Sequence, residues 1–112
     1  MALERGKLSN VVRVAAGATV GIITVAASKK VYVKSIAAFD VTGAGSTAHV
    51  YVIPNGGSVG DTTKLYNITL SASETVLIEP SYPIVLDTTG DQISVGSTGA
   101  NINFFITGDK EA

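Results

Sequence analysis

The sequence predicts an all-β protein, an antiparallel two-sheet sandwich of jelly-roll-like design with an N-terminal arm. Val, Ile, Thr, Ser, Gly and Ala dominate the composition, whereas Leu, Glu, Lys and Gln, which favour helices, are scarce. From Val11 onward, short apolar runs alternate with breaks that contain Gly, Pro, Asn, Asp or Ser. An immunoglobulin-like sandwich is the second choice, because it has about seven strands and often a core Trp, and this chain has no Trp.

The predicted strands follow from period-two alternation, which a pleated strand with one buried face requires. In AHVYVIP, for example, Val50 and Val52 face one way, and His49 and Tyr51 face the other. The run VYVKSIAAFDV loses its phase after Ser35, which indicates a bulge or a bend there. The strands are expected at residues 11–15, 19–26, 31–41, 48–54, 64–70, 74–79, 84–87, 92–95 and 102–107.

The domain organisation is simple. Residues 1–10 are polar and unpatterned and are expected to form an arm, and residues 11–112 are expected to form a single β-sandwich domain. The run at 11–30 has the outline of a secretory signal peptide, but Arg13 interrupts it and it contains no Leu. We therefore expect strands there, with Arg13 pointing outward from an edge strand, and we expect no membrane span.

Charge is divided unevenly along the chain. Residues 1–34 contain six basic residues and one acid, and residues 35–112 contain two basic residues and eight acids, for a net charge of −1. This asymmetry predicts a basic N-terminal segment that docks on an acidic neighbour, with Arg5, Lys7 and Arg13 as the protein–protein interface residues. Nucleic acid is not an expected partner, because no aromatic residues are interleaved with the basic ones.

No group of residues predicts catalysis, a cofactor or a metal ion. His49 is the only histidine, it lies in the middle of a predicted strand, and no nucleophile motif flanks it. The chain has no cysteine, and its carboxylates are not spaced as metal ligands. In DTTGD, Asp87 and Asp91 are expected to bond amides of a hairpin turn, with Gly90 at positive φ. PNGGSVGDTT is expected to be a long exposed loop.

Several segments occur in a recognisable order: MALERGKLSNVVRVAAGATV, SKKVYVKSIAAFDVTG, AHVYVIPNGG, TLSASETVLIEPSYPIVLDTTGDQISV and NINFFITG. In this order the chain resembles small all-β virion structural proteins of tailed bacteriophages. The part that carries most of this resemblance is residues 70–95. The resemblance implies a structural protein without catalytic residues. It points to a capsid decoration (cement) protein in the virion, assembled in the bacterial host cytoplasm, that binds the major capsid protein or other virion proteins.

A trimer is the expected oligomer of such a protein, because trimers match threefold sites by symmetry. Two alternatives remain open. One is a tail-, neck- or fibre-associated structural protein of the same virion. The other is a carbohydrate or host-receptor binding module, which would present exposed aromatic residues, and for which burial of Tyr32, Tyr51 and Tyr82 would be unfavourable evidence. An enzyme would need His49, Asp87 or Asp91 to converge in one pocket.

Overall fold

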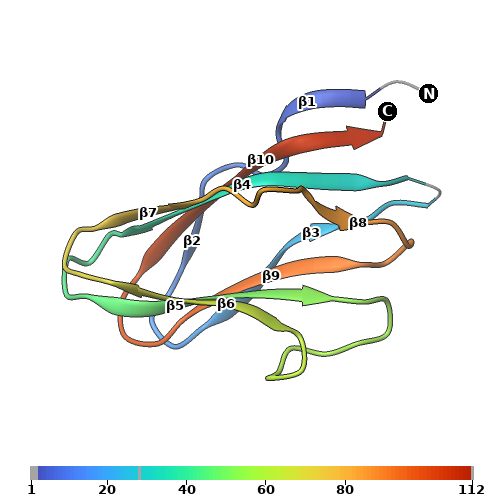
Figure 1. The fold of residues 1–112 in the computed structure, drawn as a ribbon. Coiled ribbons are helices and arrows are strands. Elements are labelled where there is room, and N and C mark those ends of the chain that lie inside the picture. The colour runs from blue at the N-terminus through green and yellow to red at the C-terminus, as the bar shows by residue number, and fades with distance from the viewer. Residues whose placement is uncertain (1–2, 28, 112) are drawn as a thin grey trace.

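A computed structural model describes residues 3–27 and 29–111 of the chain, which form two packed antiparallel sheets (Figure 1). These residues contain no helix, and therefore no helix that is long and apolar enough to cross a membrane. The strands are β1 (Leu3–Lys7), β2 (Val12–Val14), β3 (Thr19–Thr24), β4 (Val31–Asp40), β5 (Ser46–Ile53), β6 (Lys64–Leu70), β7 (Thr75–Ile78), β8 (Ile84–Leu86), β9 (Gln92–Ser97) and β10 (Ile102–Glu111).

The strands pair in a nested order. In the first sheet, called sheet A, β1 and β2 follow one another along one edge of β10, β4 lies on the other edge, and β7 and β8 pair with β4. Sheet B has the order β3-β9-β5-β6. The partners β2 and β10, β3 and β9, β4 and β7, and β5 and β6 are thus nested within one another, which is the pairing that a jelly roll requires. The predicted all-β, two-sheet antiparallel sandwich is confirmed.

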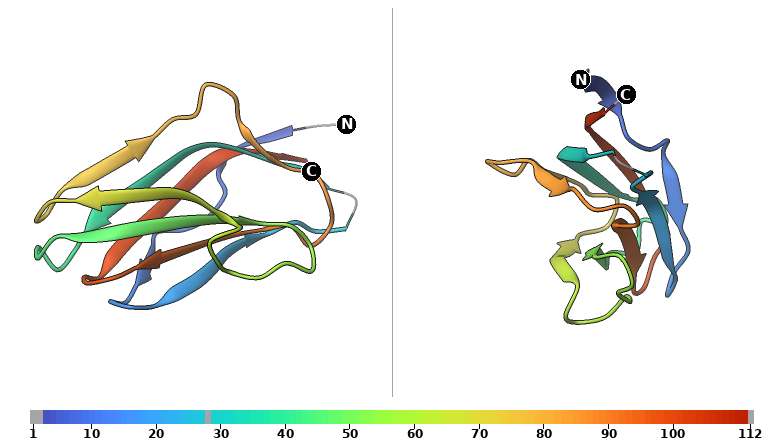
Figure 2. Two further views of the ribbon diagram at one scale, coloured as in Figure 1. Left: turned by 60° about the horizontal axis from the view of Figure 1, so that its bottom comes forward. Right: turned by 90° about the vertical axis from the view of Figure 1, so that its right-hand side faces the viewer.

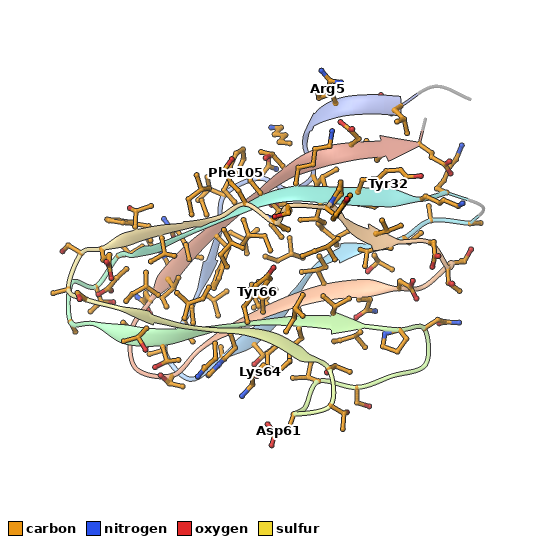
Figure 3. The ribbon with its side chains drawn as sticks, viewed as in Figure 1. Arg5, Tyr32, Asp61, Lys64, Tyr66 and Phe105 are labelled. Carbon is orange, nitrogen blue, oxygen red and sulfur yellow. The ribbon has the colours of Figure 1, made fainter. Side chains whose placement is uncertain are left out.

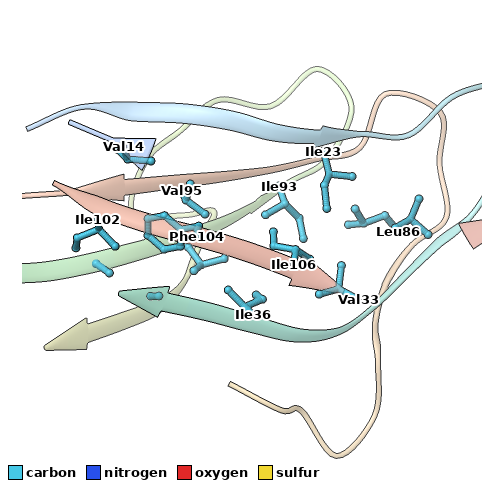
Figure 4. Close-up of a cluster of buried hydrophobic side chains, with 14 of the residues drawn as sticks. Val14, Ile23, Val33, Ile36, Leu86, Ile93, Val95, Ile102, Phe104 and Ile106 are labelled. Carbon is cyan, nitrogen blue, oxygen red and sulfur yellow. The ribbon is translucent and has the colours of Figure 1, made fainter. Parts of the chain in front are cut away.

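The core lies between the inner faces of the two sheets (Figure 4). Phe104 is its largest fully buried side chain. Its neighbours on β10, Ile102 and Ile106, are also fully buried, as period-two alternation predicts. Sheet B contributes Val50, Ile93 and other aliphatic side chains from the opposite side. Full burial of one such side chain stabilises the fold by about 1.5–3 kcal/mol.

The structure departs from the sequence prediction at both ends of the chain. Residues 3–7, expected to belong to an unpatterned arm, form strand β1 against the last residues of β10. Strand β10 therefore continues to Glu111 rather than ending at 107. The turn at DTTGD is not a hairpin turn, because β8 belongs to sheet A and β9 to sheet B. Asp91 nevertheless accepts the amide of Thr88, and Gly90 has φ +90°, both as expected.

The irregularity predicted after Ser35 is a β-bulge, and it lies at Lys34, one residue before the predicted place. The register of β4 against β10 pairs Val33 with Gly108 but Ser35 with Thr107, so Lys34 is the extra residue. The bulge brings the two backbones so close that a Cβ on Gly108 would lie 1.9 Å from the carbonyl oxygen of Tyr32. Only glycine fits there without moving the bulge.

We therefore expect Gly108→Ala to destabilise the fold by about 1–3 kcal/mol or more, because the added methyl group has to displace backbone atoms. The measurement is the free energy of unfolding in urea. Gly60→Ala is the matched control, since a Cβ there meets no atom within 4 Å. Equal stability of the Gly108→Ala variant and the wild type would show that this close approach does not exist.

Candidate functional site

The outer side of sheet A carries a row of apolar residues that face solvent. Ala37 on β4 pairs directly with Leu77 on β7 and with Phe105 on β10, so the three lie in line across the sheet. Phe39 lies two residues further along β4, and Val11 precedes β2. Leu77 is 56% exposed, Val11 62% and Phe39 39%. We call these five residues the outer apolar face.

A shallow hollow of about 180 Å³ lies within the outer apolar face. Val11, Ala37, Phe39 and Phe105 line it together with Asn103. The Oδ1 atom of Asn103 is buried and accepts no hydrogen bond from any described residue. A buried acceptor without a donor costs about 1–3 kcal/mol.

The strand registers place the three predicted interface residues on this same side of sheet A. Arg13 pairs with Asn103, which in turn pairs with Phe39. Lys7 pairs with Thr107, and Arg5 pairs with Asp109. Because Asn103, Phe105, Thr107 and Asp109 alternate along β10, their cross-strand partners face the same way. Figure 3 labels Arg5 beside β1 and Phe105 beside β10.

A carboxylate anchors the basic end of this face. Asp109 is only 6% exposed. Its Oδ2 lies 2.7 Å from Nζ of Lys34, and its Oδ1 lies 3.6 Å from Nε of Arg5, which is an ion-pair distance but too long for a hydrogen bond. The hydrogen bond from Lys34 lowers the pKa of Asp109, burial acts in the opposite direction, and the charges of Lys34 and Arg5 lower the pKa further.

A second buried carboxylate, Asp40, holds two turns together at the far end of sheet A. Its Oδ1 accepts the amide of Gly43 at 3.0 Å, and its Oδ2 accepts the amides of Gly45 at 2.7 Å and Ser73 at 3.3 Å. Burial raises the pKa of Asp40, but these backbone hydrogen bonds together outweigh it, so that the pKa lies below its ordinary value. The carboxylate links the β4–β5 turn to the β6–β7 turn and has a structural role.

The residues that an enzyme would need lie apart. His49 sits in the middle of β5 and pairs with Gly96 of β9, whereas Asp91 precedes the pair Gln92–Ile53 at the start of β9. Asp91 therefore lies five residues along the strand from Gly96, the partner of His49, a distance of about 16 Å. Burial lowers the pKa of His49, and the charge of Lys64 lowers it further. The described residues contain no cluster of three or more potential metal ligands.

The aromatic residues divide between buried and exposed positions. Tyr51 is 7% exposed, and Nζ of Lys64 lies 5.9 Å from its ring centroid. Tyr66 packs against the core between the sheets, and Tyr32 is half-buried on β4 (Figure 3). Tyr82 is 86% exposed in the loop between β7 and β8. These four tyrosines lie on different elements, whereas Phe39 and Phe105 line the same hollow of the outer apolar face.

An open cleft of about 390 Å³ lies at the edge of the sandwich, between β3 and the end of sheet A formed by β1 and β10. Its apolar wall includes Leu8, Ile22 and Val31, and its rim includes Glu4 and Lys110. Figure 2 shows β1 beside the end of β10, away from β3. Strand β1 therefore extends over the cleft instead of packing on the second sheet.

Sequence reasoning missed the two buried carboxylates and strand β1. Asp40 had a signal, because it follows Ile36 and Ala38 at an inward position of β4 and precedes the glycine-rich turn TGAGS. An acid at such a position needs donors, and glycine amides supply them. Asp109 had no comparable signal, because its partners Lys34 and Arg5 come from distant segments.

No family model and no curated protein matches the chain. Its fold is similar to that of a protein from Bacillus endospore appendages, which are disulfide-linked pili, with 18% identity and a TM-score of 0.54 over 98% of this chain and 88% of that one. It is also similar to a protein of the IBDV viral particle, with 14% identity and a TM-score of 0.53 over 97% of this chain. This chain spans 30% of that viral chain. These likenesses show a shared fold.

The two lowered pKa values predict how stability depends on pH. Unfolded Asp titrates near pH 3.9, and native Asp40 and Asp109 titrate below that value. The native state thus binds fewer protons than the unfolded chain in this range, so the stabilisation is complete above about pH 5 and is lost as the pH falls through the native pKa values.

We expect the urea concentration at the midpoint of unfolding to decrease when the pH is lowered below about 4. The double variant Asp40→Asn/Asp109→Asn should have a lower midpoint than the wild type at neutral pH, and its midpoint should depend less on pH in the acid range. An unchanged midpoint between about pH 7 and about pH 2.5 would contradict the assignment.

Proposed function

We propose that this protein is a structural subunit of a bacteriophage virion, a decoration (cement) protein that binds the capsid shell through the outer side of sheet A. The observation that carries the proposal is the combination found on that one side. The outer apolar face lies in its middle, and Arg5, Lys7 and Arg13 lie along its edge. The resemblance to small virion proteins of tailed phages supports the same role.

Exposed apolar residues next to cations match a specific kind of partner surface. Apolar residues in the centre of an interface supply most of the binding free energy, and charged residues at its rim set orientation and association rate. The partner predicted for this face is therefore an apolar capsid surface with an acidic rim.

The mechanism of such a protein is mechanical. Each copy bridges neighbouring capsid subunits and adds interface area that opposes outward pressure. A trimer at threefold or quasi-threefold axes presents three equivalent faces, and three simultaneous contacts increase the overall affinity beyond that of one. A tail-, neck- or fibre-associated role in the same virion is the alternative. The sandwich would serve either position, because function is set by the surface and not by the fold.

A pair of matched substitutions tests the docking face. Leu77→Asp places a charge on the outer apolar face, at a residue that is 56% exposed. Leu65→Asp is the control, because Leu65 is 50% exposed and lies on an edge strand of sheet B. We expect Leu77→Asp to weaken binding to capsids that lack the protein by at least about tenfold, from the lost apolar contact and the buried charge. Arg13→Glu should also weaken binding.

The control variant should bind like the wild type, and all three variants should unfold at nearly the wild-type urea concentration. Binding is measured by co-sedimentation of purified chain with capsids. Undiminished occupancy by Leu77→Asp and Arg13→Glu, or equal loss with Leu65→Asp, would rule out this face as the docking site.

A further inference from the structure

We propose that β1 is an exchangeable strand that, in the assembled protein, pairs with β10 of a second copy of this chain. The inference rests on the proposed assembly role and adds the partner of the arm. Its basis is the juxtaposition of two facts. β1 buries no residue of its own, and it nevertheless pairs in register with the last residues of β10.

The attachment of β1 to the body is limited to one edge. All five of its residues are exposed, including Leu3 at 54%. The cleft lined by Glu4 and Leu8 separates it from β3. The attachment of residues 3–7 therefore consists of the backbone ladder to β10 and the contact of Arg5 with Asp109. Leu8, which follows β1, adds a partly buried apolar contact with the core. Segments with few buried apolar contacts open at a low free-energy cost, well below that of global unfolding.

The pairing of β1 is specific for the amino-acid sequence of β10, which is the same in every copy of the chain. The register sets Glu4 opposite Lys110 and Arg5 opposite Asp109, so residues of opposite charge are paired at two successive positions, and Arg5 lies within ion-pair distance of Asp109. Gly6 faces Gly108, where the bulge leaves no space for a larger residue on β10. Opposite charges directly across a ladder stabilise it, and like charges destabilise it. A second copy of the chain presents an identical strand edge, so exchange of β1 loses none of these contacts.

The connection to β2 provides a hinge. The amides of Leu8 and Ser9 both donate to the carbonyl oxygen of Ile106, and Val12 pairs with Phe104. Asn10 and Val11 lie between these anchored positions and are both exposed. Short hinge segments of this kind favour exchange of the element they carry. Residues 3–9 then move together, and Leu8 takes the equivalent place against the core of the second copy.

Cysteine cross-linking tests the exchange, since the natural chain has no cysteine. Glu4 and Lys110 are paired and exposed, and opposed residues of an antiparallel ladder have Cα atoms at about 4.5–5.5 Å, within disulfide range. The single variants Glu4→Cys and Lys110→Cys are unfolded together in urea, refolded at high concentration and oxidised. The expected result is a covalent dimer that contains one copy of each variant, identified by mass spectrometry after non-reducing electrophoresis.

The control mixes Glu4→Cys with Leu65→Cys, whose cysteine lies on sheet B, and should give no cross-link above background. The double variant Glu4→Cys/Lys110→Cys should give covalent oligomers. Monomers with an internal disulfide, and no dimer from the mixed single variants, would overturn the proposal.

Deletion of residues 2–9 provides an independent measurement on the purified chain. Loss of oligomers in sedimentation velocity supports exchange, and unchanged oligomers overturn it. Neither experiment contains capsids. A negative result in these two experiments therefore refutes strand exchange alone, whereas the capsid-binding experiment with Leu77→Asp tests the docking face.

Discussion

The rest of the structure depends on the ten-residue ladder of β10. One edge of β10 pairs with β4 over almost its full length, and the other edge pairs with β2 and then with β1. Its inward residues, with Phe104 at the centre, fill the core between the sheets. Its outward residues, from Asn103 to Asp109, build the surface to which we assign binding. One strand therefore determines both the stability of the sandwich and the composition of its outer side.

The two faces of β10 are linked by its register. Because side chains alternate along a strand, a slip of one residue would bring Phe105 into the core and Phe104 to the surface. The bulge at Lys34 and the glycine at 108 fix this register where the ladder passes from β2 to β1. The same bulge places Lys34 next to Asp109, whose negative charge holds Arg5 at the edge. The bulge at Lys34 thus affects both the register of β10 and the position of the charged side chains at the edge of sheet A.

Most strands were predictable from the sequence because their apolar residues alternate, as Val50 and Val52 do on β5. An irregularity in β4 was predictable from the loss of phase after Ser35, although the bulge itself lies at Lys34. The outward position of Arg13 was predictable from its place in VVRVA. Strand β1 was not predictable in this way, because it has no apolar alternation. Its pairing depends on backbone hydrogen bonds and on charges at the other end of the chain. The outer apolar face also required the register, since Leu77, Ala37 and Phe105 come from separate segments.

The proposed function combines a fold with a surface. The fold is shared with a pilus protein and with part of a viral particle protein, and the proposed assembly role rests on the outer side of sheet A and its adjoining arm. The number of copies of this chain per purified phage particle, counted by quantitative mass spectrometry against the major capsid protein, tests this account most directly. A capsid decoration protein predicts copies on the order of hundreds, in a multiple of three that matches threefold sites. About six or twelve copies, as at a tail or neck, or no copies in the particle, would contradict it.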